Sequence, residues 1–138
     1  RGLTEIKIEM EFFKIVQVKT NEESIQQHLT LSALENFSNE IFPLDEPQGN
    51  DVEIGGIWGE FTLNRAVIKG GIRFSLVECP NALCWTITTG YPPERDSVVI
   101  HLTINRKRKL PEFLEEIEEF LEDHCTCLEK FFSDSLQE

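Results

Sequence analysis

The sequence predicts an α+β domain, in which an antiparallel meander sheet of four to six strands is packed by a long C-terminal helix and one or two short N-terminal helices. Three stretches lead to this fold class: an amphipathic one at 110–132, an alternating one at 5–19, and short apolar runs between turn residues at 52–104. The chain has 138 residues, the size of one ordinary domain, so we expect a single domain over 1–138.

The stretch 110–132 has the periodicity of a long helix with one apolar face. Acidic residues fill most of the positions between the apolar ones. Pro111 suits a first helical turn, because an amide hydrogen has no helical partner there. The apolar positions are Leu110, Phe113, Leu114, Ile117, Phe120, Leu121, Leu128, Phe131 and Phe132. A stripe this wide requires a sheet or a second helix to cover it.

The alternation of apolar and polar residues over 5–19 predicts a half-buried antiparallel strand. Phe13 and Ile15 break this alternation, and Lys14 falls on the apolar side. We therefore expect a β-bulge or a break near these three residues.

A helical stretch is expected to follow this strand. Thr20 or Asn21 is suited to cap its first turn, and a second capping pattern predicts a break near 30–32. Ile41 has the spacing of the second helix, and Pro43 ends it, because proline excludes helical geometry in the residue before it.

Residues 52–104 are expected to form the meander, since short apolar runs alternate with turn residues. The expected turns are Gly55-Gly56, Gly70-Gly71, Pro80-Asn81 and a longer loop at 90–96. The expected strands lie between them, at 57–64, 72–77, 84–89 and 97–105.

The charge of the chain limits the classes of partner. Formal net charge is -12, from 25 acidic and 13 basic residues. We expect no nucleic-acid binding, which requires a positive surface, and we expect a protein partner with a basic surface. No apolar run approaches the roughly 18–20 residues of a membrane span, and the sequence as given has no signal peptide, so we expect no membrane association and an intracellular location, cytoplasmic or nuclear.

The four cysteines do not predict a metal site. On a helix, Cys125 and Cys127 point roughly 200° apart, and Cys79 and Cys84 lack the spacing of a zinc-binding pair. We expect reduced thiols, with Cys79–Cys84 as the pair to suspect if the protein is secreted. We predict no metal and no cofactor.

No catalytic motif is present, so we expect a protein that is not an enzyme. The sequence lacks a nucleophile elbow and a phosphate-binding glycine loop, and its clustered carboxylates lie on a solvated helix face. Interface anchors are often aromatic, so Trp58, Trp85 and Tyr91 are candidate partner-binding residues, with core packing as the alternative. Arg106 and Arg108, in the basic run 106–109, could contact an acidic peptide or could be solvated charge at a strand–helix corner.

Part of the chain resembles the RWD domain, a relative of the ubiquitin-conjugating enzyme fold. The resemblance is carried by Leu34, Phe37 and Ile41, by Tyr91-Pro92-Pro93, and by the amphipathic residues 110–121. Residues 96–123 contain neither a cysteine nor a His-Pro-Asn motif, so the resemblance implies a protein-binding module without thioester chemistry. The strand expected at 5–19 lies outside the usual order of that family.

A second architecture uses this strand as well. One strand, two short helices, a meander and a long last helix is the order of START-like helix-grip domains, which often hold an apolar ligand between sheet and helix. A closed cavity would favour such a carrier, whereas a filled core with an exposed sheet face or edge would favour protein interaction. A central position of 5–19 in the sheet would favour the helix-grip order and an edge position the RWD order. A third hypothesis is an acidic inhibitor or immunity protein, whose binding would weaken with salt.

Overall fold

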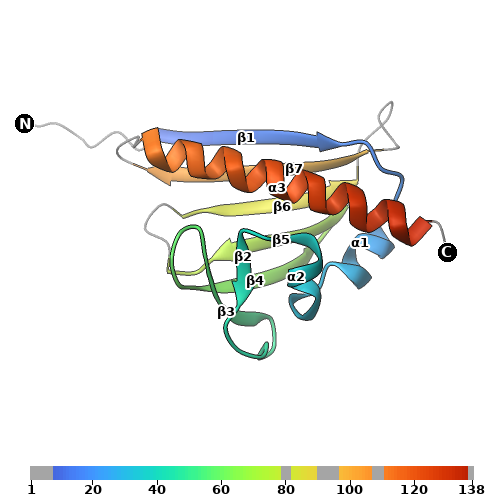
Figure 1. Ribbon diagram of the computed structural model, residues 1–138, viewed down its shortest axis with the longest axis horizontal. Coiled ribbons are helices and arrows are strands. Elements are labelled where there is room, and N and C mark those ends of the chain that lie inside the picture. Colours follow the sequence, from blue (N-terminus) through green and yellow to red (C-terminus); the bar gives the residue numbers. More distant parts are fainter. Residues whose placement is uncertain (1–7, 79–81, 90–96, 107–110, 137–138) are drawn as a thin grey trace, which may run out of the picture.

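The computed structural model describes residues 8–78, 82–89, 97–106 and 111–136. Its elements confirm the α+β fold class, with seven strands instead of four to six (Figure 1). In chain order they are β1 (Ile8–Val16), α1 (Glu22–His28), a 3-10 helix (Leu31–Ala33), α2 (Leu34–Phe37), β2 (Ile41–Pro43), β3 (Asp51–Gly56), β4 (Phe61–Ile68), β5 (Gly71–Leu76), β6 (Cys84–Thr89), β7 (Val98–Arg106) and α3 (Pro111–Leu136).

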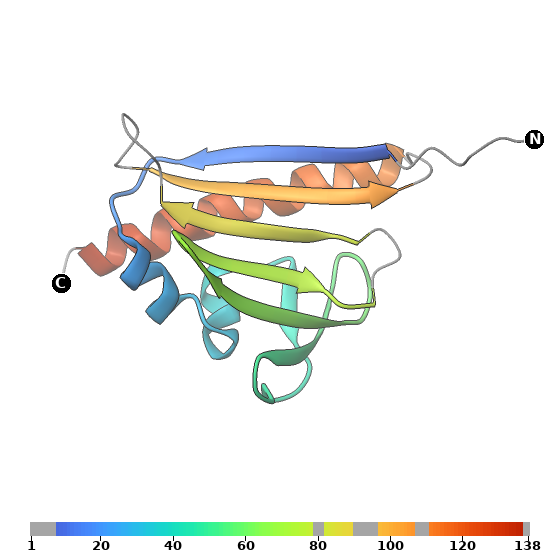
Figure 2. The same ribbon diagram turned by 180° about the vertical axis from the view of Figure 1, so that it is seen from behind.

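The strands form one antiparallel sheet in the order β1-β7-β6-β5-β4-β3-β2. The helices all cover the same face, and the opposite face is open (Figures 1 and 2). Strands β3 to β7 form the meander expected at 52–104, and β2 adds one strand to it that was not expected. β1 is an edge strand, the position that we associated with the RWD order, yet it pairs along its full length with β7. The RWD resemblance stays a prediction.

The bulge expected in β1 is absent. Its residues pair one to one with β7, from Ile8 opposite Arg106 to Val16 opposite Val98. The side chains of Phe13 and Ile15 lie on the open face of the sheet, where they are 59% and 56% exposed. Lys14 lies on the helix-covered face, where its Nζ is 3.0 Å from Glu122 and 3.5 Å from Glu118 of α3. Two acceptors on α3 therefore explain a lysine at an inward position without any irregularity of the strand.

The helical segment breaks where expected and ends earlier than expected. Asn21 caps α1 by accepting a hydrogen bond from the Ser24 amide at 2.7 Å. The 3-10 helix covers the predicted break, and α2 stops at Phe37. Ile41, which we assigned to the helix, instead begins β2 and pairs with Gly56 of β3. The helical spacing of Ile41 was therefore coincidental, since its burial comes from pairing with β3.

Gly55 and Gly56 belong to β3 and not to a turn, which also moves the next strand from 57–64 to Phe61–Ile68. The reason is close approach of β2. A Cβ on Gly56 would lie 2.3 Å from the carbonyl oxygen of Glu40, and a Cβ on Gly55 would lie 3.1 Å from the ring of Phe42. The turn predicted at Gly70-Gly71 lies one residue earlier, at Lys69-Gly70, and Gly71 begins β5 opposite Ile68. Strands β5, β6 and β7 follow close to their expected limits. The expected turn at 80–81 and loop at 90–96 lie outside the described residues.

Helix α3 confirms the amphipathic pattern of the sequence. Its inner face is buried, and six glutamates lie exposed on its outer face: Glu112, Glu115, Glu118, Glu119, Glu122 and Glu129. The buried residues are Phe113, Ile117, Phe120, Leu121, His124, Leu128 and Phe132. The helix lies across the sheet, with its C-terminal half toward α1 (Figure 1). None of the helices in the described ranges combines the length and the apolarity needed to cross a bilayer.

Candidate functional site

An aromatic cluster occupies the space between the sheet and α3, and we call it the inner aromatic cluster. Its members come from five different parts of the chain: α2, the turn after β3, β5, β6 and α3. They are Phe37, Trp58, Phe74, Trp85, Phe120 and His124. All are fully buried except Trp58, which is half-buried.

Phe120 of α3 is at the centre of this cluster. Its ring centroid lies 4.8 Å from that of Trp58, 4.9 Å from that of Trp85 and 5.0 Å from that of His124. Trp85 and His124 also contact each other edge to face, at 6.0 Å. Offset and edge-to-face contacts of this kind stabilise a core beyond the area that they bury.

The cluster contains polar atoms that are buried without a hydrogen bond. Among the described residues, no partner is found for the indole Nε1 of Trp58 or Trp85 or for Oγ of Ser38, whereas the ring of His124 interacts with the backbone carbonyl of Phe37. Burial of an unpaired polar group costs roughly 1–3 kcal/mol, so native proteins usually satisfy such groups with protein, water or ligand. The two unpaired indole nitrogens, both beside Phe120, are therefore the feature of this interior that ring packing does not explain.

His124 is uncharged in this environment. Complete burial lowers the pKa of its ring to about 4, against the opposing influence of the Asp123 carboxylate and the carbonyl of Phe37. A neutral imidazole has one N–H donor and one acceptor nitrogen. Together with the two indoles, the interior thus presents more donors than acceptors.

The structure brings together only two of the residues proposed from the sequence. Trp58 and Trp85 both contact Phe120, but Trp85 is completely buried, so its ring has no surface to offer a protein partner in this state. Core packing, the alternative stated for it, describes its position. Arg106 is the last residue of β7. Tyr91 and Arg108 lie outside the described residues.

Sequence reasoning missed His124 and Ser38. His124 follows Phe120 by four positions and precedes Leu128 by four, so it occupies the apolar stripe of the last helix. A histidine in such a stripe was the available signal. Ser38 had no comparable signal, because its burial depends on where α2 ends.

The cysteines give no sign of a site in the described part of the chain. Cys84, Cys125 and Cys127 are free, and Cys84 Sγ lies 3.2 Å from the hydroxyl of Thr103. Burial and the neighbouring Asp123 raise the pKa of Cys127 to about 11, so its thiol is protonated at neutral pH. No group of metal-ligating side chains is found among the described residues. Cys79 lies outside them.

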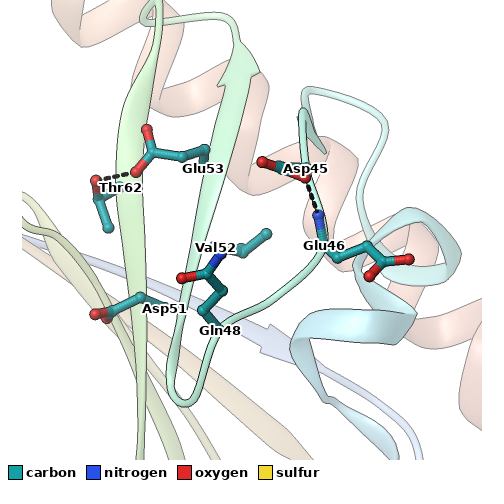
Figure 3. A pocket seen from close by; sticks show the side chains of 7 residues that line it. All are labelled: Asp45, Glu46, Gln48, Asp51, Val52, Glu53 and Thr62. Atoms are coloured by element: carbon teal, nitrogen blue, oxygen red, sulfur yellow. Dashed lines mark hydrogen bonds between the residues drawn. The ribbon is translucent and has the colours of Figure 1, made fainter.

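A hollow on the surface of the protein is strongly acidic. Its volume is about 280 Å³, and it opens between the β3–β4 ladder and the loop that precedes β3 (Figure 3). The residues that line it are Asp45, Glu46, Gln48, Asp51, Val52, Glu53 and Thr62. The Thr62 hydroxyl donates to Glu53 at 2.5 Å, and the Glu46 amide donates to Asp45 at 2.8 Å (Figure 3). The hollow adds to the negative surface of the protein.

Comparison with known proteins identifies solved structures with a similar fold. No family model and no curated protein matches the sequence. Three solved structures share the fold: the protein XoxI from Bacillus cereus (13% identity, TM-score 0.63, 94% of this chain and 98% of that one), an uncharacterised protein from Bacillus thuringiensis (13%, 0.61, 91% and 98%) and a START superfamily protein from Mycobacterium smegmatis (16%, 0.56, 91% and 97%). The chain therefore shares its overall fold with these three proteins.

Proposed function

We propose that the protein binds a small apolar molecule between the sheet and α3, without catalysing a reaction. The observation that carries this proposal is the pair of unpaired indole nitrogens on Trp58 and Trp85, whose rings both contact Phe120. The likeness in fold to a START superfamily protein supports it, because the helix-grip order places a ligand in this same layer.

Trp58 is the group whose movement would admit such a ligand. It belongs to the turn between β3 and β4 and is the half-buried member of the cluster, with an edge contact to Phe113 and a tilted contact to Phe120. Gly59, beside it, has a positive φ of 105°, and a Cβ there would be 3.9 Å from the ring of Phe61. A turn of this kind can change conformation at lower cost than the strands that hold the other rings.

The test uses the two indole N–H signals of the protein in a ¹⁵N correlation spectrum, assigned with Trp58→Phe and Trp85→Phe. Addition of 2-acetylnaphthalene, a neutral apolar compound, is expected to shift both indole signals and the amide of Phe120. Amides of Arg73 and Thr86, on the open face of the sheet, serve as the internal control. Shifts confined to that open face, or no saturable shift, would contradict the proposal.

A second candidate function is the binding of a protein with a basic surface, which the RWD resemblance also implies. It is favoured by the six exposed glutamates of α3 and by the mutual contact of the inner rings, which fill the core. An intracellular location belongs with this proposal and is equally a prediction.

A fluorescent ten-residue lysine peptide tests this second function. We expect binding that weakens steeply with salt and that is reduced in the double variant Glu115→Lys, Glu119→Lys. The double variant Glu35→Lys, Glu60→Lys is the matched control, because it changes the net charge by the same amount at exposed positions away from α3. An equal loss of peptide affinity in the α3 variant and in the control variant would mean that only the net charge matters. That result would reject α3 as the binding surface.

A further inference from the structure

We infer that the outer edge of β1 binds an extended segment of a protein partner, in which apolar and basic side chains alternate, as an additional strand of the sheet. This inference rests on the second candidate function, a partner with a basic surface, and gives that partner a site and a backbone conformation. It follows from the length of the edge, from the apolar side chains on its open face and from the acidic side chains of α3 beside it.

The two edges of the sheet differ in how well they are protected against a further strand. β2, at one end of the strand order, has three residues and ends at Pro43, and both its short length and its proline hinder strand addition. β1, at the other end, has nine residues without a proline and pairs with β7 without a bulge (Figure 2). Every second residue of an edge strand directs its backbone amide and carbonyl outward, so β1 offers the longer row of donors and acceptors.

Apolar side chains accompany this row on the open face of the sheet. Phe13 and Ile15 are more than half exposed. The ring of Phe13 stacks on that of His101, its partner across β7, with a centroid distance of 4.2 Å and planes 1° apart. The Cβ of a residue opposite Phe13 on an added strand would lie about 4.5–5.5 Å from the Cβ of Phe13. Apolar side chains on this face of the partner would therefore bury part of Phe13 and Ile15.

Acidic side chains lie on the helix-covered side of the same edge. Glu118 and Glu122 of α3 lie 3.5 and 3.0 Å from Nζ of Lys14, and their side chains are still 54% and 69% exposed. A charged side chain that points inward from an edge strand normally hinders strand addition, but these two acids outnumber the single cation of Lys14. Basic side chains on the covered side of an added strand would therefore meet net negative charge.

A second copy of this chain fits the edge less well than a basic segment does. Each copy carries a formal net charge of -12, so self-association would bring two strongly acidic molecules together. Antiparallel pairing of two β1 strands in one continuous sheet would also place α3 of both copies on the same face. Glu118 and Glu122 of both copies would then lie at one junction, where like charges repel each other.

The experiment measures binding of a fluorescein-labelled, nine-residue peptide of alternating valine and lysine to the full chain, by fluorescence anisotropy. A peptide of the same composition, with its valines and lysines in two blocks, is the control for charge and apolarity. We expect the alternating peptide to bind at least about tenfold more tightly. Two further peptides carry N-methyl groups on all valine amides or on all lysine amides. Only one of these two should lose binding, because alternate amides of an added strand face β1.

Replacement of an exposed ring tests the apolar part of the site. Phe13→Ala is expected to weaken the alternating peptide about tenfold. Phe42→Ala is the matched control, because Phe42 is a 46% exposed phenylalanine on the opposite edge strand, and it should change the affinity less than about twofold.

Replacement of paired glutamates tests the acidic part. The double variant Glu118→Gln, Glu122→Gln is expected to weaken the alternating peptide about tenfold, because the peptide loses two acids and meets an uncompensated lysine. Glu115→Gln with Glu119→Gln is the control, since both side chains are exposed on α3 and Glu119 lies near Glu40, which precedes β2. It should change the affinity less than about twofold.

Three results would overturn the inference and leave the second candidate function intact: equal affinity for the alternating and block peptides, equal losses from the two pairs of glutamates on α3, or tolerance of both sets of N-methyl groups. Self-association of the chain that Phe13→Ala abolishes, measured by sedimentation velocity, would assign the edge to a second copy and would also overturn it. Failure of both this peptide and the lysine peptide to bind would reject the inference together with the second candidate function.

Discussion

At the scale of single residues, Asp123 is the side chain that fixes α3 to the segment before β2. Its carboxylate accepts hydrogen bonds from the backbone amide of Asn39 at 2.8 Å, from the side-chain amide of Asn39 at 2.9 Å and from the amide of Glu40 at 3.3 Å. It also raises the pKa of Glu40, to which burial contributes most. One acidic residue thus orients the helix whose other side carries the inner aromatic cluster.

Replacement of this residue tests that role. Asp123→Ala is expected to lower the free energy of unfolding by about 1–2 kcal/mol, because three donors lose their acceptor and the site is only partly buried. Urea denaturation measures the change. Glu119→Ala is the control, four residues earlier on α3, and should change stability by less than about 0.5 kcal/mol. Equal effects of the two substitutions would show that helix charge, and not this contact, is responsible.

At the scale of elements, α1 depends on the sheet for its attachment. Seven residues are too few for a stable isolated helix. Arg65 of β4 donates to the carbonyl oxygens of Leu29 and Gln26, at 2.8 and 2.5 Å, so a half-buried cation satisfies the C-terminal end of the helix. Gln26 in turn donates to the carbonyl oxygens of Ile68 and Gly71 at the β4–β5 hairpin.

We expect Arg65→Met to loosen α1 selectively. The substitution keeps an unbranched apolar stem and leaves two part-buried carbonyl groups without their donor, which should cost about 1–3 kcal/mol. Hydrogen exchange of the α1 amides should accelerate more than exchange in β6 or β7. Arg73→Met, an exposed arginine on the open face of the neighbouring strand, is the matched control. Uniform acceleration across the molecule would indicate global destabilisation instead.

Elements whose signal is local could be predicted from the sequence, and those that depend on distant contacts could not. The prediction of the last helix was correct, because the apolar periodicity that indicates it lies within the residues of the helix itself. Taken without its surroundings, the dipeptide Gly55-Gly56 predicts a turn. Only the proximity of Phe42 and Glu40 explains why these glycines lie in a strand. Lys14 suggested an irregular strand because its partners are more than a hundred residues away.

The candidate site was predictable to a lesser degree. Trp58 and Trp85 were selected as aromatic residues, but the sequence does not indicate that both contact Phe120 from beneath α3. Whether a tryptophan faces solvent or core depends on which face of the sheet the helices cover, and that is a property of the whole fold. His124 carried a local signal, since it stands within an apolar stripe, and its contacts with Phe37, Trp85 and Phe120 could be recognised only in the folded chain.

At the scale of the whole molecule, acidic charge is separated from the apolar interior. The glutamates of α3 and the hollow before β3 are exposed, whereas the interior beneath the helix holds one titratable ring, His124, within the described cluster. With a formal net charge of -12, partial protonation of surface carboxylates should reduce self-repulsion and favour the folded state. Acid therefore has two opposed effects on this protein, one at the surface and one in the core.

The core effect can be isolated by comparing the protein with His124→Phe over pH. The folded pKa of His124 is lowered from 6.5 to about 4, so between these values the unfolded chain binds a proton that the folded chain excludes. Stability should therefore fall as the pH is lowered through this window. At about 1.4 kcal/mol for each pH unit, the complete loss is about 3 kcal/mol.

Free energies of unfolding at pH 7 and pH 4 give the measurement. The surface carboxylates titrate alike in both proteins, so the difference between the two profiles reports the buried ring alone. We expect the wild type to lose about 3 kcal/mol more than His124→Phe over this range. His124→Leu is a second variant without a titratable side chain, included because the phenylalanine ring is larger than imidazole and can disturb packing, and it should differ from the wild type in the same way. Parallel profiles in all three proteins would mean that the imidazole is protonated or solvated in the folded state, contrary to its complete burial against Phe120 and Trp85.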